Sequence, residues 1–536
     1  MNGPETAHGP CGGPERRRDC ASGGRTARGR LRRLVLAALL FGTAVINTSP
    51  ALAGGAMWAA AGKVDITPDL KTESIWLAGY GAKGRRPEGV HDPLHARALV
   101  VSDGEKTAAL VAVDVLGVFR EETEAIRRLL GWTGEKRYLF IAATHTHSGP
   151  DTVGLWGPLP GVSGVDKRYR KRVREAVVSL IKDLSGRLER VELRAASAKV
   201  DPRGLCRDSR DPAVLDDELN ALQVLALPGP GSKERRVLGT VVRWSCHPEV
   251  LGSKNRRVSA DYAGELCSRV EERTGGACVF FSGSIGGLMT PDTDDSGGVE
   301  GQYREMRRVG EALADKALAA LRADRGPAAA RGDRALKAGA AGGPLDFDSR
   351  VVRVPVENSR YLLFLPSLAF GHRILDQDGR PLGRRRVLSI PLRHLLFFPL
   401  PEKARPWVET EVSRLRLGPV DILGIPGELF PELAVGGFDG SRSFGHPFIK
   451  PGNANPPAVE RAPKGPYLRE RLGRHGWVVG LANDELGYLV PSYDFQVAPT
   501  RSMTPKPAGT HYEETNSIGP SATRIVLDAA DELLRN

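Results

Sequence analysis

The sequence predicts a mixed α/β fold with a large sheet-rich core flanked by helices. Apolar runs of strand length recur along the chain, and amphipathic helical patterns stand between them. Turn residues are plentiful as well, with 63 Gly and 39 Pro among 536 residues. Such alternation is typical of α/β proteins. No segment recurs at a fixed period, so a repeat architecture is not indicated.

The elements of the first half follow from this alternation. Apolar runs at residues 96–103, 108–118 and 138–147 are expected to be strands, because they are rich in Val, Leu and Ile. The amphipathic segments 121–131 and 166–184 are expected to be helices. The chain then continues with expected strands at 193–200, 219–227, 237–246 and 277–281, and with expected helices at 262–274 and 302–321.

The second half is less regular. Residues 323–345 are rich in Ala, Gly and Arg and are interpreted as a loop or hinge at a soft boundary. Strand patterns return at 351–358 and 415–427, and a helical pattern closes the chain at 522–536. Residues 360–405 combine apolar stretches with the basic run RPLGRRR. This segment fits either an insertion with exposed apolar surface that touches lipid or a buried core with a basic turn.

The N-terminus has the pattern of a secretory signal with a basic leader, residues 1–53. Four arginines between residues 28 and 33 precede an apolar run at 34–46 and an A-x-A site at 51–53. The apolar run is too short to span a bilayer of about 30 Å comfortably. We therefore expect cleavage near Ala53 and a secreted, periplasmic or cell-surface protein, with an uncleaved signal anchor as the alternative.

Charge and cysteine content narrow the classes of partner. The leader holds +5 of the net charge of +12, and no compact basic stripe with interleaved aromatic residues appears, so nucleic acid is not an expected partner. In an exported chain Cys206, Cys246, Cys267 and Cys278 can form disulfides, although spacing does not define their pairing. Oligomeric state is not predictable from these features.

Three histidines stand at the ends of strand-like runs. His145 and His147 lie one residue apart in THTHSGP, and His247 closes a second apolar run in CHPEV. Side chains at i and i+2 of a strand face the same side, so the first two imidazoles can reach one point. The pattern predicts a metal site. The alternative is a set of hydrogen-bonded structural histidines.

Further motifs follow in a fixed order along residues 61–520. They are GKVDITP, GYG, GVHDPLHARALVV, THTHSGP, CHPEVLG, ILGIPGELF, ANDELGYLVP and HYEETNSIGP. This set resembles the neutral/alkaline, non-lysosomal ceramidases, which are zinc amidases that hydrolyse the N-acyl bond of ceramide. The resemblance implies that residues 54–536 form a ceramidase-like zinc hydrolase domain with a sheet-rich core.

The resemblance also implies a set of site residues. His145, His247, Glu428 and Tyr488 match the zinc ligands, a set of donors that suits Zn²⁺ and leaves room for water. His147 matches the acid/base residue, and Tyr512 matches a tyrosine that hydrogen-bonds the reacting carbonyl. Arg207 matches an arginine of the same pocket, although Arg203 and Arg210 lie nearby in the sequence.

The sequence departs from the family pattern at several points. Thr290, in SIGGLMTP, stands where the family has a serine, and we expect it to contact the substrate or to support the site rather than act as a nucleophile. Asp151 follows THTHSGP, and the β-sandwich domain that ends the family's longer members is expected to be absent. Together with the insertion expected at 360–405, these last two departures question ceramide as the substrate more than they question the zinc chemistry.

The predicted function is therefore zinc-dependent amide hydrolysis. The resemblance implies that Zn²⁺ lowers the pKa of a bound water to about 7 and that the hydroxide attacks the amide carbonyl of ceramide or a related N-acyl lipid. Peripheral membrane contact is expected as well. Two alternatives stay open: a zinc hydrolase of another amide or ester, such as an acylated sugar or peptide, and a non-catalytic scaffold that binds lipid or glycan.

Overall fold

Most of the chain beyond the leader is described in a computed structural model. The described residues are 56–81, 83–160, 162–229, 235–323, 345–359, 372–383, 386, 389, 390, 394, 399–497 and 512–535. The predicted signal, almost all of the segment 323–345 and much of 360–405 lie outside the described residues, so the structure does not test those predictions.

An eight-stranded sheet forms the centre of the described chain. Its order is β11-β9-β8-β6-β1-β3-β4-β5, with parallel pairing at β4/β5 and β9/β11 and antiparallel pairing elsewhere. The strands are β1 (Met57–Asp65), β3 (His95–Ser102), β4 (Thr107–Val113), β5 (Arg137–Ala143), β6 (Glu189–Lys199), β8 (Glu218–Ala226), β9 (Arg236–Trp244) and β11 (Ala277–Ser282).

A four-stranded sheet and three short strand pairs complete the β structure of the described chain. The four-stranded sheet has the order β13 (Leu345–Pro355), β14 (Trp407–Leu417), β15 (Val420–Gly424) and β17 (Gly476–Val479). The short pairs are β2 (Gly89–Val90) with β10 (Arg257–Val258), β7 (Arg207–Asp208) with β12 (Met289–Thr290), and β16 (Glu428–Leu429) with β18 (Tyr488–Leu489).

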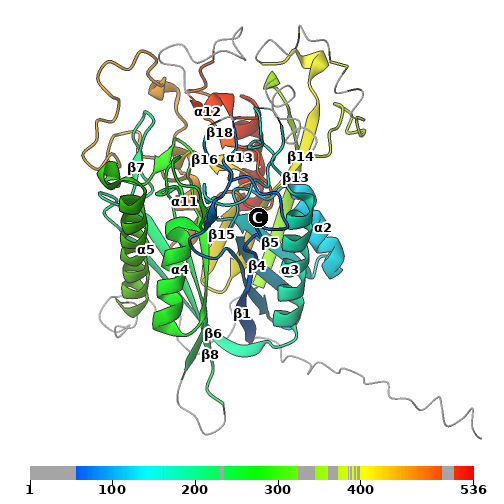
Figure 1. The fold of residues 1–536 in the computed structure, drawn as a ribbon, viewed down its shortest axis with the longest axis vertical. Coiled ribbons are helices and arrows are strands. Elements are labelled where there is room, and N and C mark those ends of the chain that lie inside the picture. The colour runs from blue at the N-terminus through cyan, green and yellow to red at the C-terminus, as the bar shows by residue number, and fades with distance from the viewer. Residues whose placement is uncertain are drawn as a thin grey trace, which may run out of the picture. The chain divides into compact units, whose positions relative to one another are not determined.

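Helices flank the sheets, as the sequence predicts (Figure 1). The longer ones are α2 (Arg120–Leu130), α3 (Lys167–Ser185), α4 (Asp261–Thr274), α5 (Gly298–Ala323) and α13 (Ala522–Arg535). The shorter ones are α10 (Pro431–Val435), α11 (Leu468–Arg471), α12 (Tyr512–Thr515) and the 3₁₀ turns η1 (Asp295–Gly297), η2 (Glu402–Ala404) and η3 (Val459–Arg461).

The elements stack in four layers: the helices α3, α4 and α5, the eight-stranded sheet, the four-stranded sheet, and α13. This stacking is possible because the side chains of each strand alternate between the two faces of its sheet. Along β3, Ala98 and Val100 pack in the cluster that contains α3, whereas Leu99 and Val101 pack with the four-stranded sheet. α4 and α5 lie side by side and cover the same face as α3 at the β9/β11 end (Figure 1). α13 covers the outer face of the four-stranded sheet. Each fully buried aliphatic side chain contributes about 1.5–3 kcal/mol.

The eight-stranded sheet curves strongly. β5 and β11 are its two edge strands, yet the rings of Phe140 on β5 and Phe281 on β11 lie 5.7 Å apart in an edge-to-face contact. Past the strands, the Ser282 hydroxyl donates a 2.9 Å hydrogen bond to the Thr144 carbonyl. The carboxyl ends of β5, β9 and β11 therefore converge, and the loops that follow them share one region.

One predicted strand proves to be a hairpin. Residues 415–427 were expected to form a single strand, but β14 ends at Leu417 and β15 begins at Val420. Leu417 and Val420 are paired across the turn, so Gly418 and Pro419 form a two-residue loop with Gly418 at φ +57°. The prediction was wrong because the Gly-Pro turn lies between apolar residues of equal character on both sides.

The four cysteines after the leader are buried, free thiols. Cys246 packs with Trp244 and Tyr262 in the core beside α4 and α5 and is not among the residues grouped as a metal site. Among the described helices, none has the length and apolar character needed to cross a membrane.

Candidate zinc centre and active-site cavity

The three histidines meet beyond the carboxyl ends of two strands. β5 ends at Ala143 and β9 at Trp244, and the curvature of the sheet brings the following loops together. The ring centroids of His145, His147 and His247 lie 5.1 to 5.5 Å apart, and one nitrogen of each lies within 4.8 Å of the others. All three are buried. The predicted convergence is confirmed.

The reason given for this convergence was wrong. His145 does not continue β5 but adopts a left-handed backbone with φ +71°, a conformation that residues other than glycine rarely adopt. Its main-chain N–H donates to the Val115 carbonyl at 3.0 Å, and its Nδ1 donates to the Leu116 carbonyl at 2.7 Å. Two main-chain contacts thus fix the backbone and ring, and the alternation of strand side chains plays no part.

His247 is anchored in a similar way. Its main-chain N–H and its Nδ1 both donate to the Met289 carbonyl, each at 2.8 Å. With Nδ1 committed to a carbonyl in both histidines, Nε2 is the nitrogen left to bind a cation. Histidines that bind metals commonly use this arrangement, because the second hydrogen bond fixes both tautomer and orientation.

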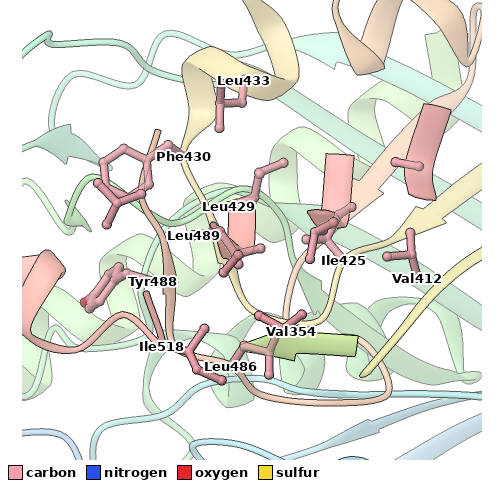
Figure 2. Packing of buried hydrophobic residues seen from close by; sticks show 14 of the residues in the cluster. Val354, Val412, Ile425, Leu429, Phe430, Leu433, Leu486, Tyr488, Leu489 and Ile518 are labelled. Carbon is pink, nitrogen blue, oxygen red and sulfur yellow. The ribbon is translucent and has the colours of Figure 1, made fainter. Parts of the chain in front are cut away.

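Glu428 and Tyr488 come from the short parallel pair β16/β18, where they are direct register partners. Leu429 and Leu489 follow them and lie side by side in a buried cluster, with Tyr488 at its edge (Figure 2). This packing anchors both strands.

The Glu428 carboxylate reaches both histidines. Its Oε2 lies 3.0 Å from Nε2 of His247, and its Oε1 lies 3.7 Å from Nε2 of His145. The four predicted ligands, scattered along the sequence, are therefore brought to one place.

Burial and the neighbouring charges in the cluster disfavour protonation of both ring nitrogens of His145 at once. Burial, reinforced by the neighbouring imidazoles, lowers the pKa of His145 well below its usual value. Burial acts in the same direction on His247, but the hydrogen bond to Glu428 and the charges of Glu249 and Glu428 together outweigh it and raise the pKa of His247 to about 9. Burial also raises the pKa of the Tyr488 hydroxyl, and the Glu428 charge adds to that effect. A cation binding between His247 and Glu428 must displace a proton.

A small cavity of about 60 Å³ that opens to solvent lies beside the cluster. Leu116, Val153, Leu155 and Trp156 give it an apolar wall, and His145, His147, Glu428, Tyr488 and Tyr512 bring polar groups to it. Gly79, Glu485, Gly487 and Asn516 complete the lining. An apolar wall beside a few convergent polar groups is typical of a site for a largely apolar ligand.

Asp151 holds the loop that forms this apolar wall. Its buried carboxylate accepts hydrogen bonds of 2.6 to 3.1 Å from the main-chain N–H groups of Val153, Gly154, Trp156 and Gly164. The loop is tied to the GYG motif as well, because the Trp156 indole donates to the Gly81 carbonyl at 2.9 Å. This departure from the family pattern therefore has a structural role next to the cavity.

The remaining predicted residues divide into two groups. Tyr512 lies at the cavity with its ring centroid 6.0 Å from that of Tyr488, and 44% of its surface is exposed. Thr290 and Arg207 are register partners on β12 and β7 and are not among the described residues that line the cavity. Arg207 is exposed at the surface.

Arg210, close to Arg207 in the sequence, is buried. Its guanidinium binds the carboxylates of Asp494, Glu513 and Glu514 at 2.7 to 3.0 Å. Because Glu513 and Glu514 follow Tyr512 on α12, Arg210 anchors the short helix that carries this tyrosine. Its position in the sequence gave no indication of that task.

Two acidic residues at the site were missed from the sequence. Glu485 lines the cavity, and burial raises its pKa well above the usual range for a carboxyl group. Glu249 lies with its Oε2 3.1 Å from Nδ1 of His147. The motifs ANDELGYLVP and CHPEVLG contain both residues, and attention to every ionisable side chain near a predicted ligand could have found them.

Comparison with known proteins finds similar chains among the ceramidases. The family model for the N-terminal part of neutral/alkaline non-lysosomal ceramidases matches residues 59–295. This part of the chain is therefore similar to the N-terminal part of that family. It is 22% identical over 275 residues to the neutral ceramidase of Pseudomonas aeruginosa, a match that spans 46% of this chain and 39% of that relative.

Solved structures of ceramidases share the fold. The crystal structure of neutral ceramidase from Pseudomonas aeruginosa superposes with a TM-score of 0.59 at 18% identity, over 90% of this chain and 75% of that one. A structure described as ceramidase complexed with C2 gives a TM-score of 0.57 at 17% identity with the same coverage. The likeness confirms the predicted mixed α/β class for most of the chain.

Proposed function

We propose that the protein is a zinc-dependent amide hydrolase that cleaves the N-acyl bond of ceramide or a related N-acyl lipid. The observation that carries the proposal is the meeting of His145, His247, Glu428 and Tyr488 beside an apolar-walled cavity in a chain similar to the ceramidase family.

The residues present fit a zinc ion. Nε2 of His145 and of His247 are held toward Glu428, while each Nδ1 is engaged by a main-chain carbonyl. Two imidazoles and a carboxylate are common zinc ligands, and the Tyr488 oxygen would be the fourth, less usual one. When bound, zinc supplies Lewis-acid activation of a water and of the substrate carbonyl.

Two side chains of the protein are proposed to perform proton transfer and oxyanion stabilisation. His147 lines the cavity next to the ligand cluster and is the group that accepts a proton from the attacking water and delivers it to the leaving amine. Tyr512 supplies a phenolic donor for the developing oxyanion, a task worth about 3–4 kcal/mol for a well-placed donor. Water adds to the carbonyl carbon, the C–N bond breaks, and a fatty acid and an amine leave.

The cavity wall supports an acyl lipid as the substrate. Leu116, Val153, Leu155 and Trp156 offer a surface that excludes water from an acyl chain, at about 0.8 kcal/mol for each buried methylene. The roles of Thr290 and Arg207 in contacting substrate stay proposals, since neither lines the cavity among the described residues.

Export and a peripheral contact with membranes are parts of the same proposal. Residues 1–53 have the sequence pattern of a secretory signal, and an N-acyl lipid substrate resides in membranes. Fractionation of expressing cells, with N-terminal sequencing of the exported protein, tests cleavage near Ala53. Retention in the membrane with residues 1–53 intact would instead indicate the signal anchor.

A substrate panel tests the proposed function. Zinc-loaded protein is incubated with a fluorescent ceramide, an N-acyl amino acid, an acylated sugar and an acyl ester, and fatty-acid release is measured. We expect release from ceramide that chelation abolishes and added zinc restores. Release only from the sugar or ester would support the alternative hydrolase, and a zinc-free, inert protein that binds lipid would support a scaffold.

A further inference from the structure

Glu249 is the side chain best placed to control the ring of His147. Its Oε2 lies 3.1 Å from Nδ1 of His147, and both side chains are largely buried, with 15% and 10% of their surfaces exposed. Neither ring nitrogen of His147 completes a hydrogen bond with the described residues, so the Glu249 carboxylate contacts Nδ1 at 3.1 Å without the alignment of a full hydrogen bond. Nδ1 therefore faces a carboxylate, and Nε2 is left for chemistry in the cavity.

The main chain around Glu249 is held from two sides. The Tyr80 hydroxyl lies 3.1 Å from the Glu249 carbonyl and 3.0 Å from the Leu251 carbonyl. The Asp261 carboxylate accepts hydrogen bonds from the N–H groups of Val250 and Leu251 at 3.2 and 2.9 Å. The carboxylate of Glu249 thus projects from a fixed backbone.

The partner ring is fixed to the same segment. The main-chain N–H of His147 donates to the Pro248 carbonyl at 3.1 Å, one residue before Glu249. Tyr80 lies against the His147 ring with centroids 5.1 Å apart, and Gly79 leaves room for the ring beneath. The distance between Glu249 and His147 is therefore set by short-range contacts and not by two long, free side chains.

We propose that Glu249 is a positioning residue that holds His147 with Nδ1 protonated and the lone pair on Nε2. The inference rests on the proposed function. During hydrolysis Nε2 takes a proton from the attacking water and passes it to the amide nitrogen as the C–N bond breaks, while the Nδ1 proton stays with Glu249. Water is consumed, and one carboxylic acid and one amine are formed.

The first test separates positioning from folding. We expect Glu249→Ala to lower kcat by about 10- to 100-fold, the usual cost of losing a partner that orients a histidine, with zinc content and KM little changed. Glu249→Gln keeps an acceptor and should recover part of the loss. Glu272→Gln, on the exposed side of α4, is the matched control.

The second test is independent of activity. ¹⁵N NMR of the zinc-loaded protein, with the His147 signals assigned through a His147→Asn variant, reports which ring nitrogen carries the proton. We expect an Nδ1–H tautomer in the wild type and a shift toward Nε2–H in Glu249→Ala. If that variant fails to fold, Glu249→Gln carries both tests.

The outcomes are distinguishable. A wild-type protein that hydrolyses none of the substrates overturns the proposed function, whereas the tautomer measurement still decides the inference. An unchanged tautomer together with unchanged kcat in Glu249→Ala would overturn the inference and leave the proposed function standing. Loss of zinc in Glu249→Ala would also overturn it, because Glu249 would then act on the ligands.

Discussion

Main-chain carbonyls orient two of the three histidines of the proposed zinc centre. The Leu116 carbonyl holds His145 and the Met289 carbonyl holds His247, so both rings are set before any ion binds. His147 has a carboxylate near Nδ1 instead. The three rings lie equally close together, but their partners divide them into two proposed ligands and one proposed acid/base residue.

Zinc content distinguishes these roles. We expect His247→Ala to lose both zinc and hydrolysis, because it removes a ligand that Glu428 also contacts at 3.0 Å. His147→Ala should keep zinc and lose about 10²- to 10⁴-fold in kcat, the usual contribution of a general acid or base. Metal analysis and steady-state kinetics measure both, with the exposed His446→Ala as a control. Zinc loss in His147→Ala would indicate a three-histidine centre.

Gly79 allows a second prediction at this scale. A Cβ at this position would lie 2.5 Å from Cβ of His147, whereas a Cβ at Gly81 would meet nothing within 4 Å. Both glycines have positive φ, at +102° and +66°, so alanine strains the backbone in each case. We expect both variants to lose about 1 kcal/mol or more of stability.

Only Gly79→Ala should displace His147. Comparison of kcat in the two variants at equal zinc content isolates the clash from the strain. Equal kcat values in Gly79→Ala and Gly81→Ala would contradict this account of the GYG motif.

The sequence predicted the ligands but not the groups that orient them. His145, His247, Glu428 and Tyr488 stand in motifs that carry the family resemblance, and all four converge. The carbonyls of Leu116 and Met289 are invisible in a sequence, because every residue has one. Glu249 follows His247 and Pro248, where an acidic residue is ordinarily interpreted as part of a solvated turn.

At the scale of elements, the N-terminus of α2 meets Asp484 and the buried His372. The Asp484 carboxylate accepts the Arg120 N–H at 2.9 Å, and Glu121 Oε2 lies 3.3 Å from Nδ1 of the buried His372. Asp484 Oδ1 lies 3.9 Å from the same nitrogen. This contact joins α2, His372 and the residue next to Glu485 of the cavity.

The stability of this contact should depend on pH. Burial lowers the pKa of His372, but Asp484 and Glu121 outweigh it and raise the pKa from 6.5 to about 9. A pKa raised in the folded state gives stabilisation that is complete below pH 6.5 and is lost as the pH rises to about 9. We expect His372→Gln to reduce the free energy of unfolding by about 2–3 kcal/mol below pH 6.5.

Denaturant unfolding of the wild type and of His372→Gln between pH 6 and pH 9.5 measures this difference, which should shrink toward the alkaline end. His446→Gln, at an exposed histidine, is the control and should show a constant, small difference. A difference for His372→Gln that grows with pH would refute the ion-pair account.

Elements with strong periodicity were predictable, and short ones were not. Helices α3 and α4 and the strands β4, β5 and β9 lie within a few residues of their predicted positions. β16 and β18 have two residues each, and these residues become strands only through the pairing of Glu428 with Tyr488 and of Leu429 with Leu489 in the folded chain. No local pattern can specify a pairing across that distance.

At the scale of the whole described domain, the proposed zinc centre joins separate parts of the fold. His145 and His247 follow strands of the eight-stranded sheet, whereas Glu428 follows β15 of the four-stranded sheet. The two sheets already share a buried core. A metal ion at this point adds a direct connection between loops from both layers.

Metal removal should therefore lower the stability of the protein. At free zinc of 100 times the Kd, binding to the folded state alone adds about 2.7 kcal/mol. We expect chelation to lower Tm in the wild type and to leave the Tm of His247→Ala unchanged. Differential scanning calorimetry with and without chelator measures both, and an equal Tm for loaded and chelated wild type would argue against a structural link.

The fold class followed from the sequence, whereas the layer arrangement did not. Alternating strand and helix patterns predicted the α/β class, and the solved ceramidase structures share the fold. The curvature that brings β5 to β11 is seen in the contact between Phe140 and Phe281, on opposite edge strands of one sheet. A contact between residues so far apart in the sequence has no local pattern that could predict it.

The left-handed backbone of His145 lowers the stability of the folded protein at a residue that the proposed activity requires. At φ +71° glycine is the relaxed choice, and any larger residue is held there at a cost of about 1–3 kcal/mol. A screen for thermal tolerance alone should therefore enrich His145→Gly among the variants of this loop, and each such survivor will have exchanged a proposed metal ligand for a relaxed peptide.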